Sequence, residues 1–124
     1  MNAKILILLL TSVSLSSIAQ ILLKTGMSEP HVALAIDGDS WIKAISAAVF
    51  NFWVIAGLTL YFLTAVLWLF VLARIEVSLA YPFVGLGFVL TMILGKFFMG
   101  DAVSATRVLG TLLIAVGVVF VSVP

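Results

Sequence analysis

The sequence contains no cysteine and few charged residues, and both absences narrow the classes of protein that it can form. Without cysteine the chain can form neither a disulfide nor a thiolate metal site. Charged residues make up 9% of the chain and the formal net charge is +1, so there is no basic surface suited to nucleic acid. A Walker-type phosphate loop and a nucleophile motif are also absent, and we expect no histidine–carboxylate pair. We therefore expect a protein that is not an enzyme and that uses no cofactor, metal or nucleic-acid partner.

Apolar residues are present in excess and make up 65% of the chain. A soluble domain is about half apolar and about a quarter charged. The surplus is more than one small core can bury, so it must face membrane lipids. Because a membrane span needs about 20 mostly apolar residues, the sequence predicts four spans, at about residues 5–27, 52–73, 78–99 and 105–121. The predicted fold is an all-α membrane protein, a single domain over residues 1–124 with four transmembrane helices in an up-down bundle.

The connection between the first two spans is the longest. Ser28–Pro30 ends the first span, because proline lacks an N–H and disfavours helix at the residue before it. Residues 31–40 contain Asp37 and Asp39 and predict a polar loop. Residues 40–50 place apolar side chains on one helical face. This pattern predicts a short interfacial helix on the membrane surface, or else an early extension of the second span.

The other connections are short turns. Arg74–Glu76 predicts a tight antiparallel hairpin of spans two and three. Gly100 is a predicted C-cap and Ser104 a predicted N-cap around the last turn. Both termini then lie on one side of the membrane, but the lysine and arginine counts leave the orientation open.

A polar stripe runs along the first span. Ser12, Ser16 and Gln20 follow one another at intervals of four residues, on one side of a helix. Such groups need partners in lipid, so the stripe predicts either interhelical hydrogen bonds or the lining of a substrate path. Tyr61 and Tyr81 lie inside the predicted span ends and are further candidates for the lining, with interface anchoring as the alternative.

Three cations and four glycines are further candidates for function. Lys24, Lys96 and Arg107 lie near one membrane face, where they can bind a phosphate or, for the two lysines, extend their side chains to the lipid headgroups. Two glycine pairs share a property: they remove side chains from the middle of a span, and they are Gly85 with Gly87 and Gly110 with Gly117. The first pair predicts a helix bend or a close helix crossing, and the second predicts a dimer interface or packing within the chain.

Several of these features together resemble the small multidrug resistance superfamily, namely Tyr61, Leu79–Pro82 and the spacing of Gly110 and Gly117. The chain is more similar to the lipid-flippase branch, whose paired subunits move undecaprenyl-phosphate-linked aminoarabinose. The matching segments are Ser16–Gln20, Val66–Trp68, Val71–Leu72, Val77–Pro82 and Ser104–Ser122. The resemblance implies a lipid flippase subunit of the bacterial inner membrane, a lipid-linked sugar as substrate, and a homodimer or a heterodimer with a second four-span subunit.

One departure from the superfamily bears on the substrate. Drug-exporting members carry a glutamate in the first span that binds protons and cationic drugs in turn, and matching on Lys24 places Ser16 at that position. Serine does not exchange a proton at ordinary pH, so the resemblance implies an anionic or zwitterionic lipid-linked substrate. A small-molecule or multidrug exporter whose partner subunit supplies the carboxylate is the alternative, and a non-transporting assembly factor is a third hypothesis.

Overall fold

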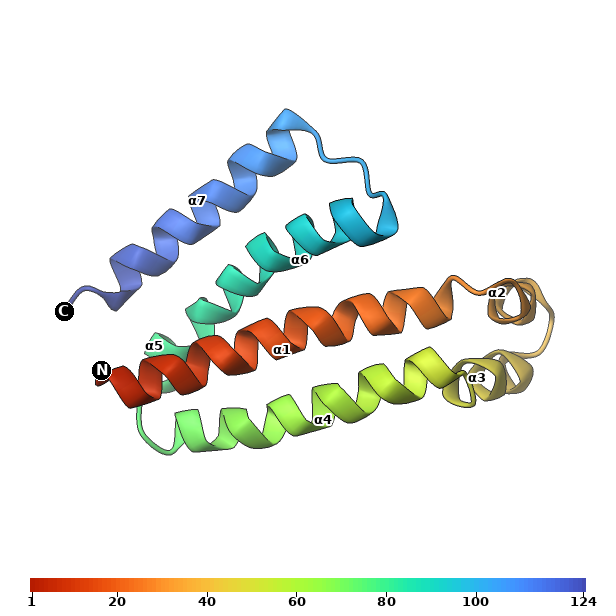
Figure 1. Ribbon diagram of the computed structural model, residues 1–124, viewed down its shortest axis with the longest axis horizontal. Coiled ribbons are helices and arrows are strands. Elements are labelled where there is room, and N and C mark those ends of the chain that lie inside the picture. The colour runs from red at the N-terminus through yellow and green to blue at the C-terminus, as the bar shows by residue number, and fades with distance from the viewer.

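The computed structural model describes residues 1–124 and contains helices but no strands (Figure 1). Four segments are long and apolar enough to cross a membrane: α1 (Ala3–Met27), α4 (Phe52–Leu72), Val77–Met99 and α7 (Ala105–Ser122). Two short helices, α2 (Pro30–Asp37) and α3 (Trp41–Val49), connect α1 to α4. The predicted all-α, multi-pass membrane fold is therefore confirmed. Successive long helices run in alternate directions in Figure 1, and both termini lie at the same end.

The predicted polar loop over residues 31–40 was wrong, because α2 occupies most of it. Pro30 lies at the start of this helix, where its missing N–H breaks no helical hydrogen bond. Val32 is fully buried, so the helix has an apolar contact that supports it. Asp37 is its last residue, which explains why the acidic residues pointed to a loop: they mark the end of the helix and not its absence.

The helix predicted over residues 40–50 is present as α3, and the alternative of an early extension of the second span was wrong. The break between α3 and α4 is made by Asn51, whose side chain is buried. Its Oδ1 accepts hydrogen bonds from the backbone N–H groups of Trp53 (2.9 Å) and Val54 (3.2 Å), which caps α4. The position of α3 on a membrane surface stays a prediction.

The third span is interrupted near its start. It consists of α5 (Val77–Ala80), a 3-10 turn η1 (Tyr81–Phe83) and α6 (Val84–Met99). The turn contains Pro82, which has no N–H to donate to the preceding helical turn. Gly85 and Gly87 lie beyond this interruption, inside α6. The helix bend proposed for these two glycines stays a prediction, and the interruption that the structure has lies ahead of them.

The caps predicted around the last turn are confirmed. Gly100 ends α6 in the left-handed conformation, with φ of 69°, which glycine adopts without steric cost. Ser104 caps α7, because its Oγ accepts a hydrogen bond from the backbone N–H of Arg107 at 3.1 Å.

Glycines allow α1 and α4 to approach closely. A Cβ atom on Gly57 of α4 would lie 2.8 Å from the side chain of Leu23 and 3.0 Å from its backbone nitrogen. A Cβ atom on Gly26 of α1 would lie 2.5 Å from Oδ1 of Asn51. Lipid is as apolar as a leucine side chain, so helices in a membrane associate through such close packing and not through the hydrophobic effect. The missing side chains are therefore what brings the two backbones together.

The contact between α1 and α6 also depends on small residues. A Cβ atom on Gly87 would lie 3.2 Å from Cγ1 of Val13 and 3.3 Å from Oγ of Ser17. The Ser17 hydroxyl lies within hydrogen-bonding distance of two carbonyl oxygens, that of Val13 at 3.1 Å and that of Gly87 at 3.2 Å. The Gly87 contact links two helices through a polar group that is satisfied inside the protein, as the membrane interior requires.

The long helices form a row that does not close into a ring. α1 packs against α4 on one side and α6 on another, whereas α4 and α6 make no substantial contact with each other. α7 packs on α6 and on η1. The order across the molecule is therefore α4, α1, α6, α7, and the side of α1 between its two neighbours is left uncovered by this chain.

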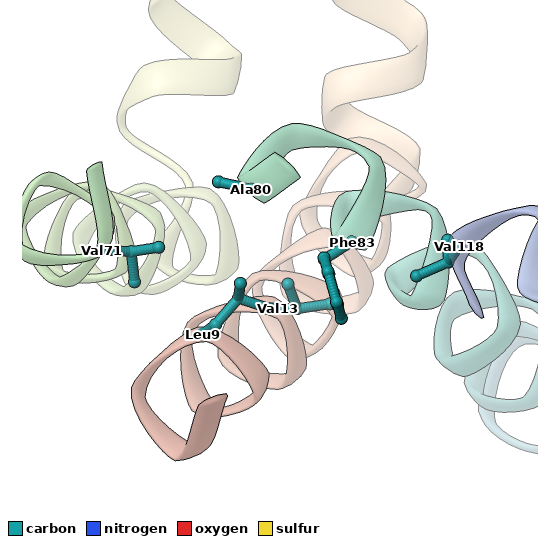
Figure 2. Close-up of a cluster of buried hydrophobic side chains, with 6 residues drawn as sticks. All are labelled: Leu9, Val13, Val71, Ala80, Phe83 and Val118. Atoms are coloured by element: carbon teal, nitrogen blue, oxygen red, sulfur yellow. The ribbon is translucent and has the colours of Figure 1, made fainter. Parts of the chain in front are cut away.

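A buried apolar cluster joins the helices at the end that carries the termini. Its members are contributed by α1, α4, the first part of the third span and α7, and they are Leu9, Val13, Val71, Ala80, Phe83 and Val118. Figure 2 shows Phe83 between Val13 and Val118. The 3-10 turn thus delivers an aromatic side chain to the point where three spans meet, which holds this end of the row together.

We expect Gly57→Ala to lower the thermal stability of the purified protein in detergent. Alanine favours helix over glycine by about 1 kcal/mol, but overpacking against Leu23 costs about 1–3 kcal/mol. The matched control is Gly38→Ala, because a Cβ atom there meets nothing nearer than 3.4 Å. A Gly57→Ala variant that melts at or above the wild-type temperature would contradict the close crossing.

Candidate functional site

A groove of about 830 Å³ opens between the long helices. Its floor is α1, because α1 is the helix that touches both α4 and α6 while these stay apart. The walls come from α4 and from the third span, and the segment from Asp101 to Thr111 contributes to one end. The polar stripe of α1 therefore faces a cavity, although the rest of the spans is mostly apolar.

All five residues predicted to line a substrate path lie on this groove: Ser12, Ser16, Gln20, Tyr61 and Tyr81. They come from α1, α4 and η1, so three separate segments bring their polar groups to one space. The i, i+4 spacing on α1 was the signal that predicted the floor. Substrate binding by these side chains stays a prediction.

The polar groups of the groove differ in what they already bind. Ser12 donates to the carbonyl of Leu8 at 3.0 Å, as serines in membrane helices often do. The side chains of Ser16, Gln20 and the two tyrosines make no hydrogen bond within the chain, and no buried polar atom is left without a partner. These four side chains are open to the groove and are free to bind water, a ligand or a second chain.

The three predicted phosphate-binding cations lie at the same end of the molecule, but the structure brings one of them to the groove. Lys24 is in the last turn of α1 and Lys96 in the last turn of α6, and both are exposed outside the groove. Arg107, in the first turn of α7, lines it. Its Nη1 donates to the carbonyl of Ala102 at 2.6 Å, and no carboxylate lies within 4.0 Å of the guanidinium.

Sequence reasoning missed several groove residues. Thr64, Thr91 and Thr111 line it. Threonine is a weak signal in an apolar span, because its hydroxyl can bond its own helix, as Thr64 does to the carbonyl of Tyr61 at 2.7 Å. Asp101 also lines the groove, although its place after Gly100 suggested only a turn. Thr64 lies three residues after Tyr61 on the same helical face, and this spacing could have predicted that Thr64 lines the groove.

The predicted dimer-interface glycines lie on an uncovered part of α7. A Cβ atom on Gly110 or Gly117 would meet nothing within 4 Å. The alternative of packing within the chain is therefore wrong for these two residues. A contact with a second chain remains a prediction.

Fold and groove together define a small multi-pass membrane protein in which several polar side chains gather in a groove between apolar helices. No family model and no solved structure matches the chain. It is 30% identical over 124 aligned positions to the probable 4-amino-4-deoxy-L-arabinose-phosphoundecaprenol flippase subunit ArnF of Shewanella sediminis, across 94% of this chain and 86% of that protein. It is 32% identical over 120 positions to the corresponding probable ArnF of Proteus mirabilis, across 91% and 87%.

Similarity extends to the ArnE subunits. The probable ArnE of Pseudomonas savastanoi pv. phaseolicola is 36% identical over 74 positions, across 60% of this chain. The chain spans 65% of the length of this relative, and 48% and 63% of two further probable ArnE proteins. The chain belongs to the family of these flippase subunits, which confirms the resemblance noted in the sequence. The relatives are named as transport proteins and not as enzymes.

We expect a cysteine introduced in the groove to react with a membrane-impermeant thiol reagent. Because the wild-type chain has no cysteine, single variants can be compared without background. Ser16→Cys, on the groove, should be labelled at least about tenfold faster than Ser14→Cys, which lies outside it on the same helix, because thiolate forms in water and not in lipid. Equal rates for the two variants in native membranes would show that the groove is not hydrated.

Proposed function

We propose that the chain is a subunit of a flippase that moves a polyprenyl-phosphate-linked sugar, such as undecaprenyl-phosphate aminoarabinose, across the bacterial inner membrane. The observation that carries the proposal is the groove, in which unpaired polar side chains from three segments and one guanidinium line a space inside an apolar protein. The names of the relatives support the same class of substrate.

A charged head group is costly to place inside a bilayer. A charged group at the centre of a bilayer costs about 3 kcal/mol by insertion scales and more by simulation. Ser16, Gln20 and Tyr61 offer hydrogen-bond donors and acceptors along the groove, which replace the lost water. Because the row of helices does not close, the polyprenyl tail can remain in lipid while the head follows the groove.

No residue within the membrane spans offers the groove a carboxylate that could couple transport to protons. The groove has a single acidic residue, Asp101, which lies in the loop before α7 and not within a span. A cation exporter of this superfamily needs an intramembrane carboxylate, and Ser16 stands where that residue would be. We therefore propose that transport is passive and is driven by consumption of the lipid on the far side.

The exposed glycines of α7 leave a surface on which a second subunit can pack. A Cβ atom on Gly110 or Gly117 would meet no atom of this chain within 4 Å. The relatives include two kinds of subunit, ArnE and ArnF. We propose that the chain acts as a dimer, either with a copy of itself or with a second four-span subunit.

The test is translocation in proteoliposomes that contain a polyprenyl-phosphate aminosugar. The chain is reconstituted alone and together with a co-expressed second four-span subunit from the same genome, and access of the head group to an external amine probe is followed. We expect flipping above empty liposomes, slowed about tenfold by Gln20→Ala, because a hydrogen bond to a charged group contributes about 1.5–3 kcal/mol. Ser14→Ala, outside the groove on the same helix, should leave the rate unchanged.

The outcomes separate the hypotheses. No flipping in either reconstitution, from folded protein, would refute the flippase. Flipping that survives Gln20→Ala would show that the head group takes another route.

A further inference from the structure

Two opposite charges line the same groove without pairing with each other. Asp101 and Arg107 are both groove residues, six positions apart around the start of α7. No ion pair joins them. The one salt bridge in the molecule is between His31 and Glu29, at 3.4 Å, so the expectation of no histidine–carboxylate pair was wrong. The carboxylate of Asp101 also accepts no hydrogen bond from the chain. Both residues are exposed, so each charge is free to bind a group that the chain does not supply.

The carboxylate is placed by two glycines. Gly100 turns the chain in the left-handed conformation, and the backbone N–H groups of Gly100 and Asp101 both donate to the carbonyl of Gly95, the second at 3.1 Å. This returns Asp101 onto the end of α6. Its Oδ2 lies 2.5 Å from where a Cβ atom of residue 95 would be. The carboxylate therefore occupies the space that a side chain at position 95 would fill.

The guanidinium is placed separately. Ser104 caps α7 through the backbone N–H of Arg107, which sets the start of the helix. Nη1 of Arg107 donates to the carbonyl of Ala102, and the remaining guanidinium N–H groups are free. Both charges are thus fixed by the turn between α6 and α7, at separate anchor points, and this arrangement keeps them available.

We propose that Asp101 and Arg107 form a two-charge site for a zwitterionic head group, in which the guanidinium binds the phosphate and the carboxylate binds an ammonium group. The proposal rests on the proposed function and names the residue that selects the amino sugar. A sugar without an amine forms no charge-assisted hydrogen bond with the carboxylate, so the site binds it less tightly than the amino sugar. Phosphoethanolamine lipids have the same two charges, so they are tested as competitors.

The experiment compares two lipids in the flipping assay, a polyprenyl-phosphate aminosugar and the same lipid with a hydroxyl in place of the amine. Because the second lipid carries no amine, its head group is followed by periodate oxidation of its sugar diol. We expect the full chain to flip the aminosugar at least about tenfold faster, and Asp101→Asn to bring the ratio close to one by slowing the aminosugar alone. Arg107→Gln should slow both lipids, since both carry the phosphate.

A second variant separates charge from folding. Gly95→Ala keeps the carboxylate but places a methyl group in the space where it lies. It should therefore reduce the ratio of the aminosugar rate to the amine-free rate, as Asp101→Asn does. Gly38→Ala, where a Cβ atom fits, is the matched control and should keep the wild-type ratio. An unchanged rate for the amine-free lipid shows that each variant is folded.

Each other outcome counts against the site. If the wild-type chain flips both lipids equally, the two-charge site is overturned while the flippase stands; if it flips neither, the flippase fails and the site with it. If Asp101→Asn slows both lipids equally, Asp101 only stabilises the turn between α6 and α7 and does not select the amine. Flipping of the amine-free lipid that phosphatidylethanolamine inhibits in the wild type but not in Asp101→Asn would assign the site to a membrane headgroup and not to the sugar.

Discussion

The close approach of α1 to both α4 and α6 is the constraint on which the rest of the structure depends. It requires side chains to be absent at Gly26 and Gly57 on one side and at Gly87 on the other. The hydroxyl of Ser17 reinforces the second contact by reaching the Gly87 carbonyl. With α1 held between them, α4 and α6 are kept apart, and the space between them becomes the groove. Packing that membrane helices need for association thus also creates the site.

The two ends of the molecule have different tasks. At the terminal end, Phe83 and its apolar neighbours join the spans (Figure 2). At the other end, the turn between α6 and α7 carries Asp101 and Arg107 into the groove. The polar floor of α1 lies between them. A ligand with a charged head and an apolar tail matches this division, because the head finds polar partners in the groove and the tail can stay in lipid.

Particular residues show which parts of the fold and of the groove the sequence could predict. The four spans and the lining residues Ser16 and Gln20 follow from hydropathy and from helical spacing, which are local properties. α2 was missed because Asp37 and Asp39 suggested a loop, although the buried contact of Val32 stabilises a helix there. Lys24 and Lys96 have the same sequence context as Arg107, a cation near a span end, yet they lie outside the groove. Nothing local distinguishes the three.

The sequence by itself determined that the chain crosses a membrane, which segments do so, and that one face of the first span is polar. The reason is that an unsatisfied polar group is costly in lipid, so apolar composition marks the spans and helical spacing marks the polar face. Only the tertiary structure decided which charges share the groove and which glycines touch another helix. Gly57 and Gly87 meet neighbours, whereas Gly110 and Gly117 meet none within 4 Å. The reason is that these properties depend on the relative placement of helices, which is set by contacts between residues far apart in the chain.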